Sequence, residues 1–514
     1  MSLTQRSLTA VFWSGADIFM RQGLQFFVSI LLARLLSPEE FGLLAMLSLF
    51  TGIAGLFIDS GFSSALIQRQ DITHKDESTV FFFNLGTGLF VAMGLCLAAP
   101  LIDRFFEQSI IPDKTFMTTL NLYSVPWLAT FFEQPVLQSL TYVMAFNLFV
   151  CSFGSIQSVL MTKALDFKTL MKIGVVASLL SGLLAVVLAL KGFGVWSLAL
   201  QTLVSTLITV TLQWLWHPWR PQWIFSFASL RSLFRFGGFL LLSGLLDTLY
   251  TRIYSIIIGK LFSARELGFY TRADNTQQLP VNVLTNVLHR VAFSVFSAAA
   301  ADKAQLARGM RKVLLMIMLF NIPAMLGLMV VAEPLVITLI GEKWLPSVPI
   351  LQVLCLSGVI WPLHVINLNV LMAQGHSNLF FRIEILKKTI CIVAIVVASF
   401  HGILAIAWSQ VVVGILCFMI NAHYTGVFLG YSAWKQTQDL LPYLAISILM
   451  ALSVWPIHIY SSLQPAAELG VMIGLGAFIY LLACRLFRLK AFNELWALLV
   501  VREKSVPNLY AENP

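Results

Sequence analysis

Long apolar runs recur along the whole chain, and they limit its possible folds more than any other feature. Fourteen runs reach about 20 residues, the length that an α-helix needs to cross a bilayer. They lie near residues 11–33, 41–63, 78–102, 136–160, 170–190, 195–216, 236–258, 279–300, 313–332, 350–373, 383–400, 403–424, 440–460 and 470–487. Only 11% of the residues are charged, whereas soluble domains carry roughly 25%. The sequence therefore predicts an all-α polytopic membrane protein with about 14 transmembrane helices.

The positive charges predict how these spans are oriented. With a cytoplasmic N-terminus, 20 of the 33 Lys and Arg residues fall on the cytoplasmic side and 8 outside, as the positive-inside rule requires. The stretch from Thr115 to Phe132 is long enough for a marginal span, but its crossing would move 17 of those 20 outside. We therefore expect an external insertion at about 108–133 and two cytoplasmic termini. Because the basic residues are dispersed between apolar runs, the net charge of +9 does not indicate nucleic-acid binding.

A short internal repeat suggests how the spans are grouped. Residues 31–43 align without gaps to residues 257–269. The identities are Leu35, Ser37, Glu40 and Gly42 of the first copy. Six spans separate the copies, so both start on the same side of the membrane, as in parallel repeats. We expect a lobe of six helices at 1–216, a second at 217–430, and two further helices with a cytoplasmic tail at 431–514. Two facing lobes predict a transporter.

Several motifs resemble those of a known family. They are IDSGFSSALIQR at 58–69, LDFK at 165–168, IGK at 258–260, LGFY at 267–270, GEKWLP at 341–346 and AQG at 373–375. In this order they resemble bacterial polysaccharide flippases of the Wzx type, which belong to the multidrug, oligosaccharidyl-lipid and polysaccharide exporter superfamily. The resemblance covers roughly residues 10–430. It departs at Tyr254, where the family usually has Asp, and at residues 108–133, which the family usually lacks.

The resemblance implies a function. A protein of this kind moves a polyprenyl-diphosphate-linked oligosaccharide from the cytoplasmic to the periplasmic leaflet of the bacterial inner membrane, by alternating access. Such a step serves the biosynthesis of O-antigen, capsule or exopolysaccharide. We expect a monomer without a cofactor that contacts lipid-linked oligosaccharide and membrane lipids. A polysaccharide polymerase is a candidate protein partner.

Arginines within the spans are the candidate cargo contacts. An ionisable side chain at bilayer depth costs at least about 2.5 to 3.5 kcal/mol on insertion scales, which makes a functional role the default interpretation. Arg21, Arg252 and Arg290 are the predicted contacts with the diphosphate, since guanidinium binds phosphate oxygens in a bidentate manner. Lining a central cleft, they would compensate the charge of the cargo.

Three carboxylates are the candidate sites for a coupling ion or proton, namely Asp17, Asp59 and Asp247. Purely structural roles are the alternatives. Asp17 and Arg21 are four residues apart and could form a local ion pair, and Asp59 could cap the inner end of the second span. The repeat offset of 226 places Arg21 on Asp247, so equivalent positions of the two lobes carry opposite charges that could pair when the cleft closes.

Other function classes lack their motifs. The sequence has no G-x-x-x-x-G-K-[ST] loop and no HExxH or other metal-ligand spacing, so we expect neither nucleotide hydrolysis nor a metal site. A membrane glycosyltransferase or polymerase is the alternative enzyme class, but the external segment 103–135 has no catalytic acidic motif. A drug or cation exporter of the same superfamily is the other alternative, and the arginines within the spans argue against cationic cargo.

Overall fold

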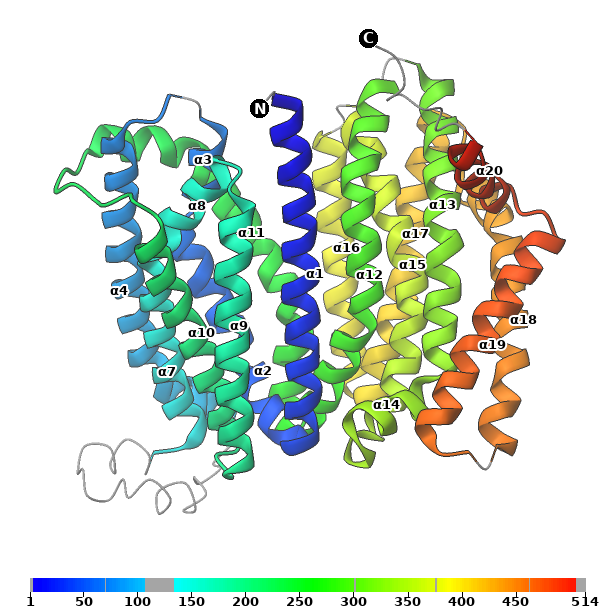
Figure 1. The fold of residues 1–514 in the computed structure, drawn as a ribbon, viewed down its shortest axis with the longest axis horizontal. Coiled ribbons are helices and arrows are strands. Elements are labelled where there is room, and N and C mark those ends of the chain that lie inside the picture. Colours follow the sequence, from blue (N-terminus) through cyan, green and yellow to red (C-terminus); the bar gives the residue numbers. More distant parts are fainter. Residues whose placement is uncertain are drawn as a thin grey trace, which may run out of the picture. The chain divides into compact units, whose positions relative to one another are not determined.

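The computed structural model describes residues 3–504, except residues 70, 107–133, 300–301, 375–376 and 462. Every regular element in this part of the chain is a helix, as the sequence predicts. The helices pack into two compact units, residues 1–271 and 272–514. Within each unit, the long helices run alongside one another (Figure 1). The lobes expected from the repeat, 1–216 and 217–430, divide the chain differently and stay a prediction. The expected insertion at 108–133 lies outside the described residues.

Unit 1 is built around long apolar helices. Its helices are α1 (Leu3–Leu35), α2 (Pro38–Asp59), α3 (Phe62–Gln68), α4 (His74–Phe106), α7 (Val136–Ser152), α8 (Ser155–Lys163), α9 (Phe167–Leu190), α10 (Val195–Trp216) and α11 (Phe227–Leu261). Helix α1 packs along α9, and α2 packs along α11. The next helix, α12 (Ala264–Ala299), begins in unit 1 and continues into unit 2.

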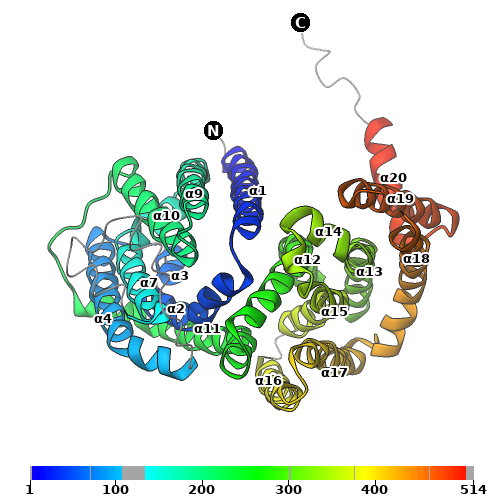
Figure 2. The ribbon, with the colours of Figure 1, turned by 90° about the horizontal axis from the view of Figure 1, so that it is seen from below.

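Unit 2 follows the same plan. After α12 come α13 (Lys303–Val330), α14 (Ala332–Ile340), the 3-10 helix η2 (Glu342–Trp344), α15 (Ser347–Ala373), α16 (Ser377–Ser399), α17 (Ile403–Leu429), α18 (Ala433–Tyr460), α19 (Pro465–Leu486) and α20 (Lys490–Lys504). Helix α15 packs between α13 and α17, while α18 packs on α13 and α19 (Figure 2). The main buried cluster of this unit joins α13, α15, α17, α18 and α19.

The candidate spans number fewer than the sequence predicts. Among the described residues, eleven helices are long and apolar enough to cross a membrane, or twelve if the bent pair α7–α8, with its 44° kink, is one span. Side chains such as Phe90 and Leu97 on α4 are 73% and 81% exposed, which fits helices that face lipid. All fourteen predicted spans fall on helices, but those at 279–300 and 383–400 lie on α12 and α16, which do not qualify.

Polar residues explain why these two helices fall short. Helix α12 carries the polar run 274–278, and α16 carries four charges within about two turns at 382–388. Glu384 and Lys387 of α16 neutralise each other in an ion pair on one helical face. The predictions of spans at 279–300 and 383–400 rested on the apolar residues of these helices and gave too little weight to their polar residues.

The motif at 58–69 produces a break in the second span. Ser60 and Gly61 both have positive φ, at 47° and 70°, so α2 ends there and α3 follows it within one candidate span, Pro38–Gln68. Glycine is needed at 61 because the backbone of Gly237 in α11 lies against it, closer than a Cβ allows. The carboxylate of Asp59 accepts a hydrogen bond from the hydroxyl of Ser63, which joins the two sides of the break.

The repeat found in the sequence forms the same local structure twice. Ser37 and Glu40 make a capping box at the start of α2, in which each backbone N–H is bound by the side chain of the other residue. Ser263 and Glu266 make the equivalent pair of hydrogen bonds at the start of α12, at 3.2 Å each. Ser37 aligns with Ser263 and Glu40 with Glu266, so two of the four sequence identities between the copies form the helix caps.

The two repeat copies also contact each other reciprocally. A Cβ at Gly42 would lie 2.5 Å from the carbonyl carbon of Ala264, and a Cβ at Gly268 would lie 2.7 Å from the carbonyl carbon of Pro38. Gly42 corresponds to Gly268 and Pro38 to Ala264, so the contact is made once in each direction. Both glycines are therefore required by close backbone approach rather than by the turn itself.

Candidate functional site

Arg21 and Asp17 form an ion pair on one face of α1. The side chain of Asp17 is 8% exposed and that of Arg21 is 46% exposed. The local pair weighed from the spacing is thus formed, but it engages one nitrogen of the guanidinium, which has five N–H donors. On the buried side, Oδ1 of Asp17 has no hydrogen-bond partner among the described residues. Among the described residues, the remaining donors of Arg21 and the buried Oδ1 of Asp17 therefore have no partner.

A glycine on the neighbouring helix makes room for Arg21. Gly174 of α9 lies against the aliphatic part of the Arg21 side chain, so that a Cβ at 174 would overlap Cδ of the arginine. Because α1 packs along α9, this contact fixes the direction in which the guanidinium leaves the helix. Nothing in the sequence indicates this role for Gly174, which is 153 positions from Arg21.

Helix α11 carries the next two predicted residues. Asp247 and Arg252 are both exposed and lie within the candidate span Leu240–Leu261. No ion pair of either side chain is formed with another described residue. The pairing of Arg21 with Asp247, suggested by the repeat offset, is not formed here, since Arg21 binds Asp17 instead.

The last predicted residues are placed differently. Asp59 is at the end of α2 and is bound by Ser63, so its carboxylate belongs to the break between α2 and α3. Arg290 lies in α12, but its side chain is outside the described part of the chain. Tyr254, where the resemblance predicts Asp, stacks its ring on that of Tyr270 at 6.3 Å between centroids and 11° between planes. Aromatic packing replaces a charge at that position.

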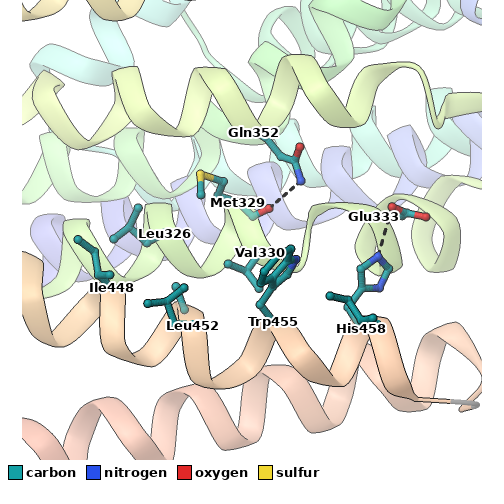
Figure 3. Close-up of a pocket in the computed structure, with 11 residues that line it drawn as sticks. Leu326, Met329, Val330, Glu333, Gln352, Ile448, Leu452, Trp455 and His458 are labelled. Atoms are coloured by element: carbon teal, nitrogen blue, oxygen red, sulfur yellow. Dashed lines mark hydrogen bonds and ion pairs between the residues drawn. The ribbon is translucent and has the colours of Figure 1, made fainter.

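A pocket in unit 2 was missed by the sequence analysis. It has a volume of about 490 Å³ and lies between α13, α14, α15 and α18 (Figure 3). Its polar end holds His458, whose Nδ1 lies 2.7 Å from Oε1 of Glu468 and whose Nε2 lies 3.3 Å from Oε2 of Glu333. These three residues come from α18, α19 and α14, so no local spacing in the sequence brings them together. No metal-binding group of three was found in the described residues.

Comparison with known proteins decides the family. The family described as "Polysaccharide biosynthesis protein" matches residues 31–122 and 114–349. The chain belongs to this family. The teichuronic acid biosynthesis protein TuaB of Bacillus subtilis (strain 168) is 26% identical over 491 residues, 93% of this chain and 95% of that protein. The lipopolysaccharide biosynthesis protein WzxC of Escherichia coli (strain K12) is 27% identical over 408 residues, 78% of this chain and 76% of that protein.

A solved structure shares the fold of this polysaccharide biosynthesis protein. The lipid II flippase MurJ in an inward closed conformation matches with a TM-score of 0.69 and 14% identity, covering 93% of this chain and 98% of MurJ. The chain is a multi-pass membrane protein of the polysaccharide biosynthesis family, and its relatives TuaB and WzxC are bacterial proteins. MurJ is named as a flippase, and a further relative of this chain is named as a succinoglycan biosynthesis transport protein. The resemblance inferred from the motifs is confirmed.

The motifs that carry this resemblance have structural roles within the described residues. Asp166 of LDFK accepts the backbone N–H of Thr169 at 3.2 Å and begins α9 as its N-cap. Trp344 of GEKWLP is fully buried, and Ser347 donates its hydroxyl hydrogen bond to the Trp344 carbonyl at 2.6 Å. They fix turns between helices, which is why they identify the fold and not the cargo.

Proposed function

We propose that this protein moves a polyprenyl-diphosphate-linked oligosaccharide from the cytoplasmic to the periplasmic leaflet of the bacterial inner membrane. The step serves the assembly of an O-antigen, capsule or exopolysaccharide. The names of two relatives support a glycan as the cargo, since one acts in teichuronic acid biosynthesis and the other in lipopolysaccharide biosynthesis. Transport proceeds by alternating access, in which two lobes rock and open the cargo site to one side at a time.

The observation that carries the proposal is the state of Arg21. This guanidinium lies within a candidate span, is half exposed, and uses one of its nitrogens for Asp17. An arginine at that depth with donors to spare is suited to a phosphate and repels a cation. Arg252 on α11 adds a second exposed guanidinium without a partner among the described residues, and Arg290 is the third predicted contact. Cationic drugs are therefore disfavoured as cargo.

Coupling to an ion or proton is assigned to the carboxylates Asp17, Asp59 and Asp247. Asp17 ranks first, because it combines burial with an acceptor oxygen that has no hydrogen-bond partner among the described residues. Asp247 is exposed on its helix, and Asp59 is bound by Ser63. Neutralising Asp17 by proton uptake would release Arg21 to the cargo.

The topology that we propose has fourteen spans and cytoplasmic termini. Helices α12 and α16 would cross as the eighth and eleventh spans, with their polar faces turned away from lipid. The lobes 1–216 and 217–430 would then each hold six spans, and α18 and α19 would follow as the last two. This arrangement keeps the excess of Lys and Arg on the cytoplasmic side.

A set of four variants tests the role of Arg21. Arg21→Ala leaves the carboxylate of Asp17 buried without its partner, which costs up to about 3 kcal/mol by itself. The double variant Asp17→Asn/Arg21→Ala removes that cost. We expect the double variant to insert at the wild-type level and to export much less glycan than Asp17→Asn alone, measured as surface glycan in a strain deleted for the chromosomal copy. The comparison with Asp17→Asn separates the effect of Arg21 from the coupling role proposed for Asp17. Arg21→Lys should restore export in part, because it keeps the charge but loses the bidentate geometry.

Arg104→Ala is the matched control, since it removes an exposed arginine at the end of α4 and should leave export unchanged. If the double variant exports glycan at the wild-type rate, Arg21 serves only to neutralise Asp17. In that case the phosphate contact proposed for Arg21 is wrong.

A further inference from the structure

We propose that the pocket of unit 2 binds a phospholipid with a primary amine headgroup, phosphatidylethanolamine. The cavity, of about 490 Å³, falls within the ~300 to 1,000 Å³ typical of small-ligand sites. It suits the headgroup and the first part of one acyl chain. This site is separate from the cargo contacts proposed above and does not depend on them.

The lining of the pocket changes from apolar to polar along α18. Ile448 and Leu452 line the apolar end, Trp455 follows one turn later, and His458 lies at the polar end near the last residue of the helix (Figure 3). Ten residues of helix separate Ile448 from His458, about 15 Å at 1.5 Å per residue. Because α18 is a candidate span that ends at Tyr460, the polar end lies at the level of lipid headgroups. An amphiphile has the same order of polarity.

One wall of the pocket opens sideways from the helix bundle. Leu452, Trp455 and Ile459 are 60%, 51% and 54% exposed although all three line the cavity. A tryptophan at the edge of the hydrocarbon region is typical of membrane interfaces, where its ring lies beside lipid headgroups. A lipid could enter from the bilayer without crossing water.

The charges at the polar end select a cation. Glu333 and Glu468 lie on either side of His458, so the cluster stays negative even when the histidine is protonated. The Glu468 side chain is 10% exposed and is occupied by His458, whereas the Glu333 side chain is 43% exposed and faces the opening. A primary ammonium supplies three N–H donors for such a carboxylate. Anionic phosphatidylglycerol and a diphosphate cargo headgroup would be repelled.

The test measures which lipid the full-length protein retains. Purified protein is incubated with equal mole fractions of phosphatidylethanolamine and phosphatidylglycerol, and native mass spectrometry counts the lipids that stay bound. We expect wild-type protein to retain phosphatidylethanolamine in preference. Glu333→Gln should reduce this preference about tenfold, the effect of one lost charge-assisted hydrogen bond. Leu452→Trp should reduce retention of the lipid without changing any charge, because it fills the apolar end.

Glu342→Gln is the matched control, since it removes an exposed carboxylate from η2, outside the pocket. It should retain lipid as the wild type does. The proposal is overturned if wild-type protein retains both lipids equally, if phosphatidylglycerol is preferred, or if neither pocket variant alters retention. A fourth outcome that overturns it is displacement of the bound lipid by polyprenyl phosphate, which would make the pocket a site for the cargo chain.

Discussion

The reciprocal contact between the starts of α2 and α12 leads to a quantitative prediction. Gly42→Ala places a methyl group 2.5 Å from the carbonyl carbon of Ala264, where ordinary contact begins at 3.4 Å. The neighbour is backbone at a helix start, so no side-chain rotation relieves the overlap, and the two segments must separate by about 1 Å. Overpacking of this kind costs about 1 to 3 kcal/mol. The carbonyl oxygen of Ala264 lies closer still, so the upper end of this range applies. Alanine regains up to about 1 kcal/mol through its higher helix propensity, so we expect a net loss of about 2 kcal/mol.

The equivalent change on the other copy should have nearly the same effect. Gly268→Ala meets the carbonyl carbon of Pro38 at 2.7 Å. Once one methyl group has separated the segments, the second fits with less strain, so the double variant should lose less than the sum of the two single variants. Gly55→Ala is the control on α2, because a Cβ there has nothing within 4 Å.

The assay is the midpoint of thermal unfolding of detergent-solubilised protein, followed by tryptophan fluorescence at a fixed heating rate. Both single variants should unfold several degrees below the wild type, and Gly55→Ala should unfold at or above it. If Gly42→Ala and Gly268→Ala unfold at the wild-type temperature, the close approach is not formed in the predominant state. Strict additivity of the two losses would contradict the reciprocal contact even if each variant is less stable.

Reporter fusions test the proposed topology: one at Lys343 should report the outside and one in the C-terminal tail the cytoplasm, and a tail found outside would mean that a span was miscounted. Gly174→Ala should lower glycan export severalfold by displacing Arg21 from α9, while Gly23→Ala, which meets nothing within 4 Å, should export normally; equal export by both variants would contradict the positioning role. Burial and a neighbouring arginine lower the pKa of His217, whose Nδ1 accepts a backbone N–H at 3.3 Å. Because the folded protein binds a proton at His217 less readily than the unfolded chain does, the fold loses stability as the pH falls below the ordinary pKa of histidine. The unfolding midpoint should therefore drop between pH 7 and pH 5, and the drop should be smaller in a His217→Asn variant; an identical drop would exclude His217 as its cause.

The parts of the fold that depend on nearby residues could be predicted from the sequence. Apolar length located every long helix, the spacing of Asp17 and Arg21 indicated their ion pair, and the aligned pair Glu40 and Glu266 proved to be helix caps. The predicted count of fourteen spans is higher than the eleven or twelve candidate spans among the described residues, because α12 and α16 combine apolar and polar segments. Length alone does not tell whether such a helix crosses the bilayer.

The parts that depend on distant residues could not be predicted. Glu333 and His458 are 125 positions apart and meet only because α14 and α18 pack in the same unit. The space that Gly174 leaves for Arg21 is likewise a property of two packed helices and has no trace in either segment alone. The candidate arginines were found because an arginine within a span is unusual by itself, whereas their partners were not.

The contact between the two repeat copies has the pattern of an isologous interface. Gly42 contacts Ala264, and its equivalent Gly268 contacts Pro38, the equivalent of Ala264. The same pair of positions is in contact twice, as in a homodimer with a two-fold axis. A single ancestral lobe could have made this contact twice with itself. Such a dimer must carry the same charge at both copies of every position, whereas the fused chain has Arg21 in one half and Asp247 in the other. The contact between the copies is therefore symmetric, whereas the charges that the two copies carry are not.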